Sequence, residues 1–376
     1  MALDNNHEAF FALVRAGLWE KEIQLLPYEQ INYNEINRLA EEQSVTGLIA
    51  AGFEHIVDVK APQDEFLQFV GSALQIERQN LAMNEFIAKL IEKLREADVY
   101  TILMKGQGIA QCYERPLWRA SGDVDLFMSD ENYKKAVIFL SPLSTSIDKE
   151  NTYNKHLAMS IGSWVVELHG ALRFGLWGSM DAVLDEVQKE VLCGGTVRSW
   201  MNGATQTFLI RADEDVIFVF AHILQHFYQE GVGLRQICDW CRLLWTFRGT
   251  IDKRLLESRL HKMRVIREWK SFAAFAVEYL GMPNDSMPFY SSSNIWRRKA
   301  EYIKNFVLKV GNYGVREPKS SRTHSAFIRK ILSFFEIFKY TFRHFFFFPI
   351  SSIRSFFYQV WIGMKLNIVS HTCRHE

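Results

Sequence analysis

The residues best suited to chemistry lie between positions 99 and 128, in two short apolar segments. The first segment ends at Lys105 and Gly106, and the second holds Asp123 and Asp125 with one apolar residue between them. On a β-strand these two carboxylates share a face and lie roughly 6.6 Å apart along the chain. Such a pair is costly unless a divalent cation lies between the charges. The pair therefore predicts a metal site, and the chemistry that best fits it is phosphoryl transfer, whose spreading negative charge hard cations stabilise.

A third carboxylate follows on the predicted hairpin HLAMSIGSWVVELHG, which bends at Gly162 and Ser163. Alternation along the second strand of this hairpin turns Glu167 away from the apolar residues. If that strand neighbours the strand of Asp123 and Asp125, about 4.8 Å away, Glu167 joins the two aspartates on one sheet face. We expect Asp123 and Asp125 to hold two Mg²⁺ ions and Glu167 to complete the site at the incoming hydroxyl, whose pKa a bound metal lowers.

Basic and small residues near the aspartates are suited to phosphate. Gly106 lets backbone amides approach a phosphate, the helix predicted to follow offers its N-terminal donors, and Lys105 adds a positive charge. Arg119 and Ser121 flank the aspartates and are predicted to contact triphosphate oxygens. Each motif alone is more typical of a solvated turn or an edge strand. Their occurrence in order, within one unit, favours the metal-site interpretation.

The surrounding pattern predicts an α+β fold in which a small mixed sheet holds these residues. Apolar residues recur at helical spacing in residues 7–98, strand-like patterns begin at Val99, and the helical period returns near Glu214. Between them, strand, helix, strand, helix and hairpin form the core, which N- and C-terminal helical domains flank. The predicted segments are an N-terminal helical domain (1–98), the α/β core (99–205), a helical domain that closes the cleft (206–282) and a Phe-rich basic C-terminal segment (283–376).

The composition limits the class of protein. Hydrophobic residues make up 48% and charged residues 23% of the 376 positions, which is typical of a globular protein with a large core. The formal net charge of +1 excludes a global attraction to nucleic acid. The N-terminal sequence lacks the basic leader of a secretory signal, and five cysteines without such a signal indicate reduced thiols. We therefore expect a cytoplasmic protein.

The C-terminal residues 326–369 are crowded with phenylalanine and interleaved with basic residues. The longest charge-free stretch is shorter than the roughly 20 residues that span a bilayer, so a transmembrane segment is not predicted. Two interpretations remain. A helical pair packs its apolar face on the body, which we favour, or residues 326–365 form a basic amphipathic segment at the inner membrane surface.

The motifs together resemble those of a known superfamily. The run ILMKGQGIAQCYERPLWRASGDVDLF, followed by VVELHG, resembles the DNA polymerase beta-like nucleotidyltransferases, and more narrowly the family of uncharacterised bacterial nucleotidyltransferases. That family has a strand ending in Lys-Gly, an Arg before Asp-hydrophobic-Asp, and an acidic residue before Leu-His. The positions that match in this chain are Lys105, Gly106, Arg119, Asp123, Asp125, Glu167 and His169.

The resemblance implies an enzyme that transfers a nucleoside monophosphate from a nucleoside triphosphate such as ATP to a hydroxyl group, releasing pyrophosphate, with Mg²⁺ as cofactor. It implies metal binding and catalysis by the three carboxylates. The residues implied to bind the nucleotide are Lys105, Gly106, Arg119, Ser121 and His169. The similarity covers most of the chain through about residue 248.

Two other functions fit the same pattern. One is a toxin-like nucleotidyltransferase that acts on RNA or on a protein. The other is a non-catalytic module of an envelope or polysaccharide assembly system, which docks on a membrane through residues 326–365.

A later helix carries histidines one turn apart, at positions 222 and 226. This is the spacing of a zinc-protease pair, but Ile223 stands where the catalytic glutamate would be, so that function is excluded. We favour a helix packed with satisfied polar residues. The alternative is that His222, His226 and Arg235 line the cleft opposite the carboxylates and hold nucleotide or acceptor.

Overall fold

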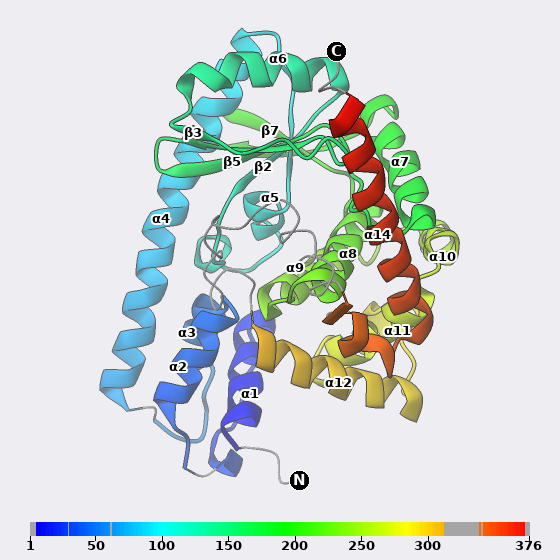
Figure 1. Ribbon diagram of the computed structural model, residues 1–376. Coiled ribbons are helices and arrows are strands. Elements are labelled where there is room, and N and C mark those ends of the chain that lie inside the picture. Colours follow the sequence, from blue (N-terminus) through cyan, green and yellow to red (C-terminus); the bar gives the residue numbers. More distant parts are fainter. Residues whose placement is uncertain (1–4, 29, 61, 312–337, 340, 373–376) are drawn as a thin grey trace.

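The centre of the molecule is a seven-stranded mixed sheet with helices on both faces (Figure 1). The structure is a computed structural model, and it describes residues 5–28, 30–60, 62–311, 338–339 and 341–372. The α+β class and the mixed sheet that the sequence predicts are confirmed. The helices are α1 (Asn5–Trp19), α2 (Tyr33–Glu42), α3 (Thr46–Phe53), α4 (Gln63–Glu96), α5 (Gly106–Ala110), α6 (Asp130–Leu140), α7 (Gly178–Cys193), α8 (Ala212–Gln229), α9 (Leu234–Thr246), α10 (Lys253–Met263), α11 (Ile266–Glu278), α12 (Asn294–Val310) and α14 (Pro349–Thr372).

The sheet combines the two predicted core strands, the predicted hairpin, a second hairpin and the two-residue strand β3. Its strands are β1 (Ile102–Met104), β2 (Val124–Phe127), β3 (Ser146–Ile147), β4 (His156–Ile161), β5 (Trp164–His169), β6 (Arg198–Asn202) and β7 (Thr205–Leu209). They lie in the order β3-β4-β5-β2-β1-β7-β6. Strand β2 runs parallel to β5 and antiparallel to β1, and β1 runs parallel to β7.

The sequence analysis did not anticipate the hairpin β6–β7. Strand β7 begins at Thr205, the last residue of the predicted core segment, so the sheet itself continues to Leu209. The division of the whole chain into four segments stays a prediction.

One face of the sheet is covered by α4 and α6 (Figure 1). Leu103, Val124 and Leu126 from neighbouring strands share a buried apolar cluster with residues of both helices. Ser129 begins α6 by accepting a hydrogen bond from the backbone N–H of Asn132 at 3.3 Å. Successive side chains of β2 point to opposite faces of the sheet. Since Val124 and Leu126 are buried on this face, the carboxylate of Asp125 lies on the opposite face.

The opposite face looks toward α8 and α9, which lie below the sheet in Figure 1. These two helices are separated at Gly231–Gly233. Phe127 of the sheet shares one large buried cluster with residues of α1, α8, α9 and α11. This cluster joins the N-terminal helices to the later helices.

Glycines allow α1 and α3 to approach each other closely. A Cβ atom added to Gly17 would lie 1.9 Å from the carbonyl oxygen of Leu48, which is backbone and cannot rotate away. We expect Gly17→Ala to lower the free energy of unfolding by about 1–3 kcal/mol through overpacking, measured by urea denaturation. The control is Gly71→Ala in α4, where an added Cβ meets nothing within 4 Å. Equal free energies of unfolding for Gly17→Ala and Gly71→Ala would show that α1 and α3 do not pack this closely.

The described part of the C-terminal segment is packed on the body along one side and exposes large apolar side chains along another. Residues 326–337 and 340 of the predicted segment lie outside the described residues. Phe348 and His344 are buried against the body, and α14 turns the small side chains of Ser352 and Ser355 inward. Large apolar side chains of this segment face outward instead, namely Phe346, Ile350, Ile353, Phe357, Trp361 and Met364.

The favoured interpretation, an apolar face packed on the body, therefore holds only for part of this segment. Serines on the inner face permit close contact with the body, which leaves the bulky residues of α14 outside. Among the described residues, no helix combines the length and the apolarity needed to cross a membrane.

Candidate active site

The three predicted carboxylates meet on the face of the sheet that looks toward α8. Strands β2 and β5 pair in parallel, and the register places Asp125 directly beside Glu167. One ligand oxygen from each of Asp123, Asp125 and Glu167 lies within 4.8 Å of the others. These groups open into a cleft of about 940 Å³ between the sheet and the helices α8 and α9. The predicted convergence of side chains from two strands is present in the fold.

The charges of the carboxylates act strongly on one another. The side chain of Asp125 is only 2% exposed. The charge of Asp125 raises the pKa of Asp123, and burial and the charge of Glu167 raise it further. A hard divalent cation with oxygen ligands would relieve this repulsion, so the donor set fits Mg²⁺.

Lys105 lies at the carboxylates. Its Nζ donates to Oδ1 of Asp125 at 2.7 Å, and although burial opposes the charge, Asp125, Glu167 and Asp123 raise the pKa of Lys105. The backbone is in the left-handed region at Lys105 (φ +50°) and at Gly106 (φ +37°). A non-glycine residue there is strained, and such strain is typical of functional turns.

The turn after β1 departs from the sequence prediction in one respect. The helix that follows, α5, has only five residues and begins at Gly106 itself. A helix this short offers no developed N-terminal dipole. The cationic side chain of Lys105 is therefore the stronger feature of this turn.

Arg119 and Ser121 line the cleft, but both have partners in the protein. Arg119 donates from Nε and Nη2 to the two carboxylate oxygens of Asp239 at 2.8 and 2.6 Å, and both side chains are buried. Tyr113 donates to the same carboxylate at 2.7 Å. Ser121 donates to the side-chain oxygen of Asn80. Asp239 thus holds the Arg119 guanidinium at the cleft wall.

His169 lies among the carboxylates, next to a histidine that the sequence analysis missed. Its Nε2 is 2.9 Å from Oδ1 of Asp125, while Nε2 of His156 is 3.0 Å from Oε2 of Glu167. Burial would lower the pKa of His169, but hydrogen bonds to Asp125 and Glu167 raise it above its ordinary value.

The hairpin itself contained the signal for His156. A bend at Gly162 and Ser163 pairs Ile161 with Trp164, and counting outward along both strands pairs His156 with His169. The register of the hairpin therefore brings this second imidazole beside His169 at the site.

Comparison with protein families identifies one family to which this chain is similar. The model of that family, described as uncharacterised nucleotidyltransferase, matches residues 29–281, more than half of the chain. The chain belongs to this family. Comparison with curated proteins and with solved structures gave no match. Membership supports nucleotidyl transfer as the general activity of this chain and implies a nucleoside triphosphate as substrate.

The matched range also includes the opposite wall of the nucleotidyltransferase cleft. His222, His226 and Arg235 all line that wall. Burial, together with the charges of Lys105 and His226, holds the pKa of His222 well below its ordinary value, so this imidazole is neutral. Nε2 of His226 lies 3.0 Å from Nε2 of His222.

Arg235 is the cation of this wall best placed for a phosphate. Its Nη1 donates to the backbone oxygen of Ala120 at 2.7 Å, and its Nε is buried without a hydrogen-bond partner in the described part of the chain. Burial and then the charge of Arg119 lower the pKa of Arg235. An anion in the cleft would offset both the burial of Arg235 and its repulsion by Arg119.

Proposed function

We propose that this nucleotidyltransferase moves a nucleoside monophosphate from a nucleoside triphosphate such as ATP to a hydroxyl group of an acceptor and releases pyrophosphate, with Mg²⁺ as cofactor. The observation that supports this most is the register of β2 and β5, which sets Glu167 beside Asp125. The Lys-Gly turn, the paired aspartates and the neighbouring glutamate also favour a mechanism of the DNA polymerase beta-like type. We place the reaction in the cytoplasm of a bacterium.

In the proposed reaction the acceptor oxygen forms a bond to the α-phosphorus. The bond from that phosphorus to the bridging oxygen breaks, and pyrophosphate leaves with its electron pair while the hydroxyl proton passes to water. Mg²⁺ held by Asp123, Asp125 and Glu167 would neutralise phosphate charge and lower the pKa of the hydroxyl.

The other residues of the cleft would bind and orient the nucleotide. A cation bound by Asp125 competes with Lys105 for the same carboxylate, so we expect the Lys105 ammonium to turn toward the phosphates. Arg235 meets them from the opposite wall, and Arg119, held by Asp239, borders the same space. The proposed functions of Gly106, Ser121 and His169 are to shape this surface around the triphosphate.

The decisive experiment incubates the full chain with each labelled nucleoside triphosphate, with Mg²⁺ or with a chelator. Small hydroxyl compounds, RNA and protein are supplied in separate reactions as acceptors. We expect release of pyrophosphate and labelling of one acceptor class, both abolished by the chelator. Labelling of RNA or protein would identify the toxin-like alternative, and an absence of metal-dependent nucleotide binding would refute the proposal.

We further propose that the chain associates with a membrane surface through α14. The outward face of this helix is apolar, with Phe357 66% and Trp361 46% exposed. Soluble surfaces rarely expose so many large apolar side chains together. A cavity of about 470 Å³ lies beside this face, where α14 crosses the start of α7.

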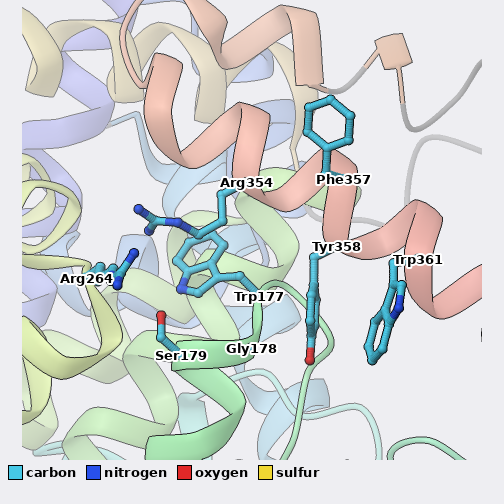
Figure 2. Close-up of a pocket in the computed structure, with 8 residues that line it drawn as sticks. All are labelled: Trp177, Gly178, Ser179, Arg264, Arg354, Phe357, Tyr358 and Trp361. Atoms are coloured by element: carbon cyan, nitrogen blue, oxygen red, sulfur yellow. The ribbon is translucent and has the colours of Figure 1, made fainter.

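Positive charge adjoins the apolar face in this cavity. Figure 2 shows the guanidinium groups of Arg264 and Arg354 pointing toward each other above Ser179, with Tyr358 and Trp361 at the other end. Burial and then the charge of Arg264 lower the pKa of Arg354, and its Nη1 has no hydrogen-bond partner among the described residues. Paired cations beside an apolar helical face suit the headgroups of anionic lipids.

We expect the double variant Phe357→Ser and Trp361→Ser to bind anionic vesicles at least about tenfold more weakly than the wild type, because two apolar side chains no longer enter the lipid interface. Sedimentation with vesicles of anionic or of zwitterionic lipid measures this. The control is Ile138→Ser on α6, a residue that is 75% exposed. If the wild-type chain does not sediment with anionic vesicles, the membrane proposal is wrong.

A further inference from the structure

The imidazoles of His156 and His169 converge on one carboxylate oxygen of Glu167, which is itself one of the three acidic residues. His156 begins β4, and Glu167 and His169 come from the end of β5. Antiparallel pairing sets His156 directly opposite His169, and their ring centres are 4.8 Å apart. This cluster is distinct from the group of Asp123, Asp125 and Glu167, with which it shares only Glu167.

The atoms that converge are the ones that bind metals. Nε2 of His156 lies 3.0 Å and Nε2 of His169 lies 3.6 Å from the same oxygen, Oε2 of Glu167. The three ligand atoms lie within 4.8 Å of one another. Oδ1 of Asp125 is 2.9 Å from Nε2 of His169 and adds a fourth donor at the edge of the cluster. Two imidazole nitrogens and one carboxylate are a donor set that binds a metal and leaves a position open.

Accessibility and charge at this point also favour a cation. The side chains of His156, Glu167 and His169 are 30%, 21% and 13% exposed, so the cleft gives an ion access to all three. Lys105 is the cation that faces them from the turn after β1, and it is already paired with Asp125. The acidic side chains of Asp123 and Glu167 remain to attract a further positive charge.

We infer that His156, Glu167 and His169 form a second metal position that takes a borderline transition-metal cation, Zn²⁺ or Co²⁺, in preference to Mg²⁺. Nitrogen donors select such ions, whereas Mg²⁺ prefers oxygen ligands and is reluctant to lose its water. This inference rests on the proposed nucleotidyl transfer, since Glu167 would join the two positions. A shared carboxylate suits a two-metal site, here with two different ions.

The test measures metal binding directly, without activity. The metal-free full chain is titrated with Co²⁺ and followed by its visible absorption, then with Zn²⁺ in competition and with Mg²⁺. We expect one equivalent of Co²⁺ to give the intense bands of a low-coordinate site with nitrogen ligands. His156→Asn should weaken Co²⁺ and Zn²⁺ binding by about 100-fold or more and leave Mg²⁺ binding unchanged.

Controls separate this inference from folding and from the proposed reaction. His261→Asn removes an exposed histidine from α10 and should bind Co²⁺ as the wild type does. His169→Asn repeats the test from the other strand, and thermal unfolding shows whether each variant is folded. Unchanged Co²⁺ affinity in folded His156→Asn would overturn the inference while leaving Mg²⁺-dependent transfer intact. A chain that binds Co²⁺ through His156 but transfers no nucleotide would overturn the proposed function instead.

Discussion

Replacement of Asp125 by asparagine is expected to lower the rate of nucleotide transfer by about 10³-fold. The substitution keeps the shape of the side chain but removes the charge that lies between Glu167, His169 and Lys105. A metal ion contributes several kcal/mol to stabilising a transferring phosphoryl group, and each 1.4 kcal/mol is about tenfold in rate. The loss should fall on kcat rather than on KM alone, because the charge on the phosphoryl group is largest in the transition state.

The measurement is the initial rate of pyrophosphate release under saturating nucleoside triphosphate and Mg²⁺. Asp98→Asn is the matched control, because this aspartate is 78% exposed outside the cleft and also pairs with a lysine, Lys135. We expect the control to retain the wild-type rate. Equal rates for Asp125→Asn and Asp98→Asn would show that the carboxylate cluster does not carry the reaction.

Replacement of Asp239 by alanine is expected to lower the free energy of unfolding by about 3–5 kcal/mol. Arg119 and Asp239 form a bidentate pair in which the side chains are 5% and 7% exposed. Removing one partner of a buried ion pair leaves the other charge desolvated and unpaired, which costs more than the pair contributes. Tyr113 also loses the acceptor of its buried hydroxyl.

Urea denaturation measures this loss, and a half-exposed pair provides the control. Arg173 and Asp185 are also bidentate, but their side chains are 41% and 40% exposed. Water solvates both groups, so Asp185→Ala should cost less than about 1 kcal/mol. If Asp239→Ala and Asp185→Ala lower the free energy of unfolding by similar amounts, burial of the Arg119–Asp239 pair does not make its disruption more costly.

Much of the carboxylate site was predictable because its geometry is local. Alternation along a strand sets which face Asp123 and Asp125 share, and the two-residue bend at Gly162 sets the pairing of the next hairpin. The family match over residues 29–281 agrees with the resemblance that the sequence motifs indicate.

The partners of the basic residues could not be predicted in the same way. Arg119 is held by Asp239, 120 residues further along the chain, and no periodic pattern connects the two. Lys105 was expected at phosphate, and the structure places its ammonium on Asp125. Electrostatic pairing depends on distance in space, so it follows from packing rather than from sequence spacing.

The sequence by itself determined that Asp123 and Asp125 share one face of a strand, that Glu167 points away from the apolar residues of a second strand, and that a Lys-Gly turn ends a third, because strand periodicity and turn geometry are local properties. Only the tertiary structure decided that β5 lies beside β2 in the register that pairs Asp125 with Glu167, and that α8 and α9 close the cleft with Arg235. It also decided that α14 turns serines inward and aromatic residues outward. These features depend on which surfaces pack against each other, and that packing depends on contacts throughout the chain.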